Sequence, residues 1–193
     1  MSRRKLAPNS PREAAKSATP RDGSGEEGDR LTHLDRHGRV RMVDIGEKSS
    51  TRREAVARGV LKMSRPTLTA ILGGKLKKGE ALGAAQLAGI MAAKRTHELI
   101  PLCHQIPLES VRVEFKATSD RRAIEIEARA FCEAKTGVEM EALVAVSAAA
   151  LTLYDMAKAI DRAMVIGDIR LVRKTGGRSG DFVRAREIAW SED

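Results

Sequence analysis

The chain has 193 residues, of which 42% are hydrophobic, and this composition indicates a globular protein of one domain with at most a tail. Its net charge of +9 suits an anionic partner such as a nucleic acid, a membrane surface or a small polyanion. Aromatic residues make up only 3%, which argues against nucleic acid, because binders of single strands stack bases on aromatic side chains.

No segment predicts a membrane span or a secretory signal. The longest apolar run, residues 142–153, is shorter than the roughly 18 to 20 residues that a span needs. Basic residues near the N-terminus are not followed by an apolar segment. Cys103 and Cys132 are too few for a disulfide framework, so we expect a cytoplasmic protein.

The first half of the chain predicts a tail, two strands and two helices. Residues 1–30 are rich in Ser, Pro, Gly and charge, which predicts a disordered polar tail ahead of a single domain over 31–193. A short strand is expected at 40–44, and the alternating pattern of 53–63 favours a strand over a helix. Helices are predicted from the cap Ser64 to Gly73, and over 80–99 with Leu82, Gln86, Ile90, Leu87 and Met91 along one side.

The second half predicts a hairpin, a central helix and a last strand. Residues 111–133 alternate in polarity around a turn at 118–120, and 165–173 reads as the final strand. The segment 183–187 is expected to be peripheral. The order predicts an α+β, ferredoxin-like fold, with an antiparallel sheet and helices packed on one face.

The central helix carries the clearest candidates for chemistry. Residues 135–158 open with Lys-Thr-Gly, continue with Glu139 and Glu141, and end with Asp155 and Lys158 around an apolar run. Asp155 and Lys158 lie three apart and so share a helical face. A lysine beside an aspartate in a partly desolvated site can transfer protons near neutral pH.

Other polar residues allow two interpretations each. Lys75, Lys77 and Lys78 form either a solvated loop or an anion site, and the glycine-rich loop 174–181 gives only a weak anion-binding signal. His33 and His37 read as solvated loop residues. His104 fits a core histidine as well as a functional one, and we expect no metal, since Cys103, His104 and Cys132 lack zinc-ligand spacing.

Several separated motifs resemble one family. KTGVEMEAL followed by LTLYDMAKA is similar to the molybdenum cofactor biosynthesis protein C family, the cyclic pyranopterin monophosphate synthases. LTHLDRHGRVRMVDIGEK, GIMAAKRTHELIPLCH and KTGGRSGDF extend the resemblance over roughly residues 31 to 182. It implies a lyase that converts (8S)-3',8-cyclo-7,8-dihydroguanosine 5'-triphosphate to cyclic pyranopterin monophosphate and pyrophosphate, without a cofactor.

The resemblance also implies roles for particular residues. Asp155 and Lys158 would be the catalytic proton-transfer pair. The substrate-binding residues would be Leu102, Cys103, His104, Met140, Glu141, Glu139, Arg53, Lys78, Lys94 and Lys174. Gln105 stands where the family more often has proline, which leaves the pose of 104–107 open.

The resemblance further implies a homohexamer built from dimers, whose partner is the small-molecule substrate. We expect a site shared between subunits, with Lys78 of one chain serving Asp155 of another. Two alternatives remain at this point: an RNA-binding module of the same topology, which would need aromatic residues on its strands beyond Phe115 and Phe131, and an anion-binding regulator, which would not need the Asp155–Lys158 pair.

Overall fold

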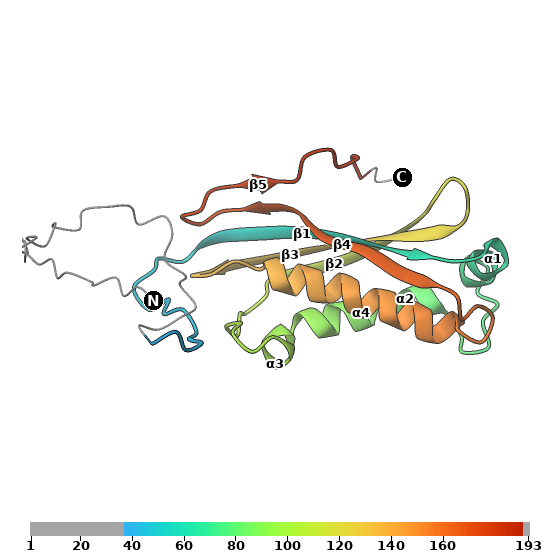
Figure 1. Ribbon diagram of the computed structural model, residues 1–193, viewed down its shortest axis with the longest axis horizontal. Helices are drawn as coiled ribbons and strands as arrows, with labels where there is room; N and C mark the ends of the chain where they lie inside the picture. The colour runs from blue at the N-terminus through green and yellow to red at the C-terminus, as the bar shows by residue number, and fades with distance from the viewer. Residues whose placement is uncertain (1–36, 191–193) are drawn as a thin grey trace, which may run out of the picture. The chain divides into compact units, whose positions relative to one another are not determined.

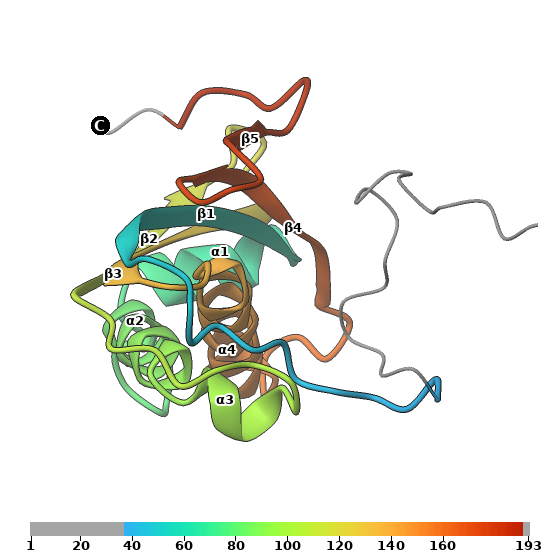
Figure 2. The same ribbon diagram turned by 90° about the vertical axis from the view of Figure 1, so that its left-hand side faces the viewer.

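The structure is a computed structural model that describes residues 37–190, so the predicted tail over 1–30 and His33 lie outside the described residues. The elements are β1 (Thr51–Lys62), α1 (Arg65–Leu72), α2 (Ala81–Ala93), α3 (Thr96–Leu99), β2 (Ser110–Ala117), β3 (Ala123–Ala134), α4 (Glu139–Ala157), β4 (Val165–Thr175) and β5 (Phe182–Val183). The strands form one antiparallel sheet in the order β2-β3-β1-β4-β5. The helices cover one face of it (Figures 1 and 2), which confirms the α+β class and the ferredoxin-like order.

The sheet and α4 make the core. β1 buries Ala55, Ala57 and Leu61, as its alternating pattern predicts for a strand with one face against helices. A Cβ atom on Gly59 would lie 2.7 Å from Val146 Cγ1, so glycine is needed there for α4 to approach β1. By length and composition α4 could cross a membrane, but half of it is buried inside the protein, where it packs as a core helix.

The predicted helix over 80–99 is in fact two helices. α2 ends at Ala93, and α3 begins at Thr96, whose hydroxyl donates to Ala93 O at 3.0 Å and so takes a carbonyl of the preceding turn. The predicted line of apolar residues was also partly wrong, since Leu87 and Met91 are exposed. The small Gly89 packs instead, and a Cβ there would lie 2.9 Å from Ala145 O on α4.

Residues 40–44 are not a strand, which corrects another prediction. Only an isolated bridge at Val40 is formed. Asp44 Oδ1 accepts from Gly46 N at 2.8 Å and closes a turn. The carbonyls of Val43 and Gly46 accept from side chains rather than from a neighbouring strand.

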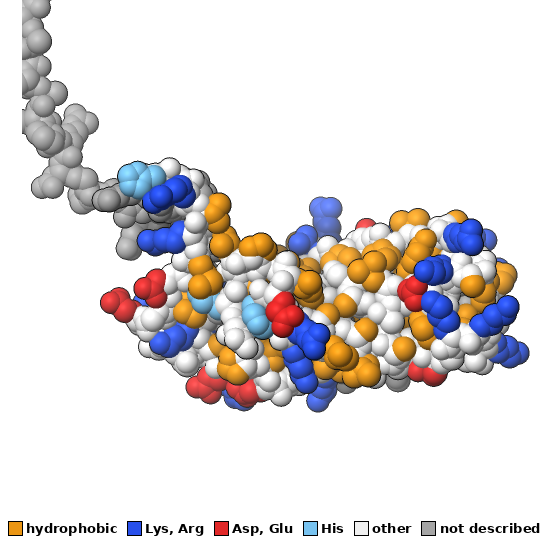
Figure 3. Space-filling view, turned by 90° about the horizontal axis from the view of Figure 1, so that it is seen from below, with side chains coloured by type: hydrophobic (Ala, Val, Ile, Leu, Met, Phe, Trp, Pro, Cys, Tyr) orange, Lys and Arg blue, Asp and Glu red, His pale blue; other side chains and the backbone are white. Residues whose placement is uncertain are grey.

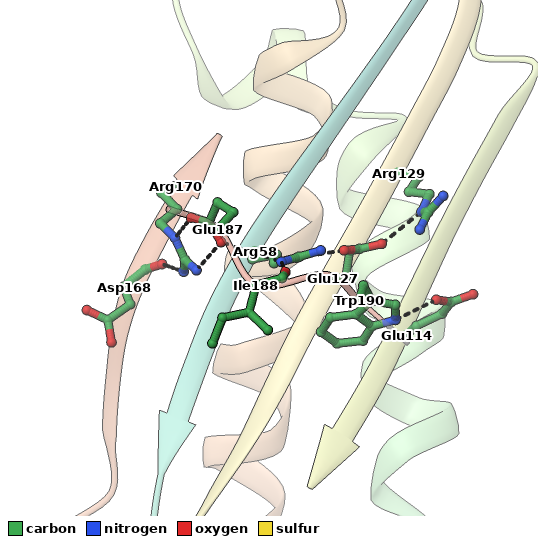
Figure 4. Close-up of polar contacts among 9 residues, drawn as sticks. All are labelled: Arg58, Glu114, Glu127, Arg129, Asp168, Arg170, Glu187, Ile188 and Trp190. Atoms are coloured by element: carbon green, nitrogen blue, oxygen red, sulfur yellow. Dashed lines mark hydrogen bonds and ion pairs between the residues drawn. The ribbon is translucent and has the colours of Figure 1, made fainter. Parts of the chain in front are cut away.

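The segment after β4 is not peripheral. It forms β5 at the sheet edge and then crosses the face that carries no helices (Figures 1 and 2). Figure 4 shows how it is held: Glu187 accepts from Arg58 and Arg170, and Trp190 Nε1 donates to Glu114 Oε2 at 3.2 Å. Arg58 also pairs with Glu127, which is only 1% exposed. We name residues 184–190 the C-terminal clamp.

A hollow of about 710 Å³ lies between the C-terminal clamp and the sheet. Charged side chains line it, including Arg58, Arg170 and Glu187. The Glu187 carboxylate pairs with both Arg58 and Arg170, and Arg58 pairs in addition with Glu127. The hollow is therefore part of the clamp's packing, and the candidates for chemistry lie elsewhere.

Candidate active site

The candidate residues gather at the two ends of α4. Glu139, Met140 and Glu141 lie in its first turn, and Asp155 lies near its last. With a rise of 1.5 Å per residue, Glu141 and Asp155 are about 21 Å apart along the axis. We call the residues around the first turn the entry cluster and those around the last turn the exit cluster.

The exit cluster is an aspartate between two lysines. Lys158 Nζ lies 2.7 Å from Asp155 Oδ1, one helical turn away, as the spacing predicted. Lys78 Nζ, from the loop before α2, lies 2.5 Å from Asp155 Oδ2. Hydrogen bonds from Lys158 and then from Lys78 lower the pKa of the Asp155 carboxyl to about 2. Asp155 is therefore an anion at neutral pH, facing two ammonium groups.

The contact of Lys78 with Asp155 lies within one chain, so the prediction that Lys78 serves Asp155 of another chain was wrong. The loop before α2 is short, and α2 packs antiparallel to α4, which brings Lys78 onto the last turn of α4. Figure 3 shows lysine and arginine side chains gathered at this end of the helical face. The exposed cations there are Lys75, Lys77, Lys78, Lys158 and Arg162.

The entry cluster contains a buried carboxylic acid. Glu141 is 3% exposed, and this burial raises the pKa of its carboxyl to about 7, with repulsion from Glu139 adding to the effect. Burial and then the charge of Glu141 also raise the pKa of the Cys103 thiol and bring the pKa of Cys132 to about 11. Both cysteines are therefore neutral thiols at physiological pH and poor nucleophiles. Glu141 can carry or release a proton near pH 7.

Arg53 joins the entry cluster from β1, opposite Cys132 on β3. Its Nε is buried and has no hydrogen-bond partner among residues 37–190. The glycine-rich loop packs against it: Gly176 and Gly177 both have φ of +86°, and a Cβ on Gly177 would collide with the Arg53 guanidinium. A buried guanidinium N–H without an acceptor is unusual, and such a group can donate a hydrogen bond to an anion.

The glycine-rich loop also holds Lys174 at this end. Lys174 lies opposite Ala55 on β1, and its Nζ donates to Ser179 Oγ at 2.7 Å. Gly176 N donates to Asp181 Oδ1 at 3.1 Å and closes the loop. The loop thus presents a second cation beside Arg53, which strengthens the weak anion-binding signal of the sequence.

The loop after α3 brings three further predicted residues to the entry cluster. Leu102, Cys103 and His104 are half-buried, and the charge of Glu141 reaches the Cys103 thiol. His104 Nε2 lies 2.9 Å from Val43 O. Lys94 caps the end of α2 at the same end of the molecule and is exposed. No group of three His, Cys, Asp or Glu in the described part of the chain could hold a metal.

Comparison with known proteins adds a decisive observation. The profile of the MoaC family matches residues 42–177, which is more than two thirds of the chain. The chain belongs to the MoaC family. Both clusters, from Arg53 to Lys174, lie within the matched residues.

Curated MoaC relatives agree over nearly their whole length. A cyclic pyranopterin monophosphate synthase of Pelotomaculum thermopropionicum is 59% identical over 162 residues, covering 84% of this chain and 95% of that protein. A protein of the same name from Chloroflexus aurantiacus is 58% identical over 156 residues, covering 81% and 96%. One from Peptoclostridium acidaminophilum is 56% identical over 154 residues, covering 80% and 97%. Membership of MoaC removes the RNA-binding module and the anion-binding regulator as alternatives.

Sequence reasoning missed some members of the MoaC entry cluster. Lys135 Nζ donates to Gly46 O at 2.6 Å. The charge of Glu109 reaches the Cys132 thiol and contributes to its raised pKa. Lys135 opens the Lys-Thr-Gly turn, so the motif itself was the available signal. The register that sets Arg53 opposite Cys132 has no counterpart in local sequence.

Proposed function

We propose that this chain is a cyclic pyranopterin monophosphate synthase of molybdenum cofactor biosynthesis. It acts on the cyclised dihydro-GTP of that pathway and releases pyrophosphate, as a soluble enzyme of the cytoplasm. Family membership supports the reaction, and one structural observation supports the place where it occurs. That observation is the buried Arg53 Nε, which has no partner among the described residues; the charges of Arg53 and Glu141 both reach the Cys132 thiol.

The reaction divides into steps that such side chains can assist. The aminal of the guanine-derived ring opens and closes again as a pyranopterin. A ribose hydroxyl attacks the nearest phosphorus, its O–H proton is lost, and the bond to the departing pyrophosphate breaks, leaving a cyclic phosphate. No step changes an oxidation state, so the reaction as written needs proton transfer and charge stabilisation only.

The entry cluster holds the substrate. Arg53 and Lys174 contribute cations for the triphosphate, with Lys94 at the rim, and stabilise the charge on the departing pyrophosphate. Leu102, Cys103 and His104 line the pocket with Met140. Glu141, whose carboxyl has a pKa of about 7, exchanges a proton with the ring at neutral pH, with Glu139 beside it.

The exit cluster transfers protons at the reacting atoms. The Asp155 carboxylate accepts a hydrogen bond from Lys158 and so orients its ammonium group. Lys158 is the acid and base that transfers protons to and from the substrate. Lys78 shares Asp155 and adds a positive charge for phosphate oxygens. The Asp155 carboxylate is held by two ammonium groups, so loss of either lysine leaves the other in place.

The distance between the clusters supports a site made by two chains. About 21 Å along α4 separates Glu141 from Asp155, too far for both to act on one small substrate. We infer that the entry cluster of one chain meets the exit cluster of a second, in a homohexamer built from dimers. A two-fold interface of this kind carries two equivalent pockets.

The direct test of the activity is incubation of the purified protein with the cyclised dihydro-GTP while pyrophosphate release is followed. Stoichiometric pyrophosphate and cyclic pyranopterin monophosphate are expected. Binding of the substrate without pyrophosphate release, in protein that is folded and oligomeric, would contradict the proposed function.

A further inference from the structure

Two side chains of the entry cluster hold one backbone segment in place. His104, after α3, contacts Val43 O at 2.9 Å, and Lys135, before α4, donates to Gly46 O at 2.6 Å. These side chains come from loops 31 residues apart in the sequence, yet their acceptors are three residues apart. In Figure 2, which views the molecule from the end where α4 starts, the segment after residue 37 runs across that end. We name residues 43–46 the pinned segment.

The pinned segment has its own turn but no strand partner. Gly46 N donates to Asp44 Oδ1 at 2.8 Å, and Lys48 N donates to Ile45 O at 3.1 Å. These local bonds bend the segment without fixing it against the domain. The long-range polar contacts that join it to other described elements come from His104 and Lys135. Its position against the entry cluster therefore depends on these two side chains.

The contact with Val43 also settles the tautomer of the neutral His104 ring. A carbonyl oxygen only accepts, so Nε2 must carry the hydrogen. Nδ1 then keeps its lone pair. It has no hydrogen-bond partner among residues 37–190. A nitrogen in this state can accept a hydrogen bond from an O–H or N–H of a ligand, whereas the other tautomer could only donate at that position.

We propose that residues 43–46 are a wall of the substrate pocket, that Lys135 is a positioning residue which holds this wall, and that the Val43 carbonyl fixes His104 so that Nδ1 accepts from an N–H or O–H of the substrate. The proposal rests on the proposed function for its ligand, but the wall is a property of the protein alone. Lys135 thus acts through Gly46 and does not touch the reacting atoms.

Two substitutions of His104 separate the two roles of its ring. His104→Gln places an amide N–H near the position of Nε2, so the contact with Val43 persists while the acceptor at Nδ1 is lost. His104→Asn places an amide oxygen near the position of Nδ1, so the acceptor persists while the contact with Val43 is lost. Lys135→Met removes the second contact, Lys135→Arg can restore it, and Lys75→Met is the matched control, an exposed lysine at the other end of α4.

The wall is tested by hydrogen–deuterium exchange of peptides spanning residues 42–48, measured on the intact protein without substrate. Exchange should rise about tenfold in Lys135→Met and in His104→Asn, and stay at the wild-type rate in Lys135→Arg, His104→Gln and Lys75→Met. Wild-type exchange in both Lys135→Met and His104→Asn would overturn the wall. This result does not depend on whether the protein turns over the substrate.

The tautomer and the ligand contact are tested by ¹⁵N-histidine NMR and by kinetics. The chain has four histidines, so the His104 signals are identified by their loss in His104→Gln. The neutral ring should show Nε2–H and a bare Nδ1 that shifts when substrate binds. Lys135→Met should raise KM more than it lowers kcat, and His104→Gln should lower kcat/KM by about tenfold or more. An Nδ1–H tautomer, or wild-type kcat/KM in His104→Gln, would overturn the assignment.

Discussion

Glu141 lies in the first turn of α4, where burial of its carboxyl opposes its ionisation. Its carboxyl is 3% exposed and close to Glu139, and the raised pKa of about 7 follows from the loss of solvent around it. The N-terminus of a helix favours negative charge, but here burial outweighs that contribution. A buried carboxyl whose pKa is raised close to neutral pH is a candidate for proton transfer.

We predict that this cost is visible in the pH dependence of stability. In the unfolded chain Glu141 ionises near its ordinary pKa of 4.5, while in the folded protein it stays protonated up to about pH 7. The folded state therefore binds more protons between these values, and stability falls as the pH rises through this window, by about 3 kcal/mol in all. Glu141→Gln should remove this fall, leaving stability near pH 4 similar and raising it at pH 8. Urea unfolding at fixed protein concentration measures the difference; a variant that keeps the wild-type pH slope would contradict it.

Asp155 and Lys158 carry the second prediction at this scale. Asp155→Asn or Lys158→Ala should lower turnover by about two to four orders of magnitude, because each removes a proton-transfer group. Both are exposed, so the melting temperature should change little. Asp161→Asn is the matched control. Asp161 accepts from Ser64 N at 2.9 Å and from Ala163 N at 3.0 Å, so its loss should lower stability and spare turnover. Near-normal turnover in either exit-cluster variant would reject their assignment.

At the scale of elements, the C-terminal clamp shows how the helix-free face of the sheet is stabilised. Arg58 on β1 joins Glu127 on β3 to Glu187 of the clamp, and its guanidinium lies 5.3 Å from the Trp190 ring (Figure 4). The Glu127 carboxylate is buried beneath this arrangement. If the cations that pair with a buried carboxylate are removed, an uncompensated charge is left in the interior and the folded state is destabilised.

Arg58→Met should therefore destabilise the protein by about 2 kcal/mol, because the buried Glu127 would lose one of its two arginine partners and keep Arg129, whose Nε lies 2.8 Å from it. Lys62→Met, on the same strand and with an ion pair of 3.9 Å between exposed groups, should change stability by less than about 0.5 kcal/mol. Denaturant unfolding of both variants gives the comparison. Equal effects of the two substitutions would mean that the clamp contributes nothing beyond a surface ion pair.

Periodicity predicted most elements, and local chemistry explains the exceptions. Alternation gave β1 and the hairpin of β2 and β3, and the apolar run gave α4. The break between α2 and α3 depends on a hydroxyl that bonds to the preceding turn, and the turn at 44–46 on an aspartate side chain. The clamp was missed because its partners, Arg58 and Arg170, are 129 and 17 residues away from Glu187 in sequence.

The candidate site was likewise predictable only in part from the sequence. The Asp155–Lys158 pair follows from helical spacing, and the remaining residues were named through family motifs. What the sequence could not supply is the grouping of those residues, since the packing of the glycine-rich loop on Arg53 joins positions more than 120 residues apart. Nor could it show that Lys78 pairs with Asp155 within one chain.

At the scale of the whole molecule, the role of residues 1–30 is still a prediction. Their composition predicts a dispensable polar tail. A chain that begins at Leu31 should keep the melting temperature and the turnover of the full chain. A clear loss of either would show that the tail docks on the domain.

The most direct test of the account asks whether the entry cluster of one chain and the exit cluster of a second form one active site. Asp155→Asn lacks a working exit cluster and Lys174→Ala a working entry cluster, so each alone should be inactive. After partial dissociation and mixing, a mixed dimer holds one intact pocket and one with both lesions, and a random equal mixture should regain about a quarter of wild-type activity. Mixing Asp155→Asn with Lys158→Ala, two lesions in the same cluster, should regain nothing. Recovery in the first mixture alone is the predicted result; no recovery in it, with subunit exchange confirmed by mass spectrometry, would show that one chain carries the whole site.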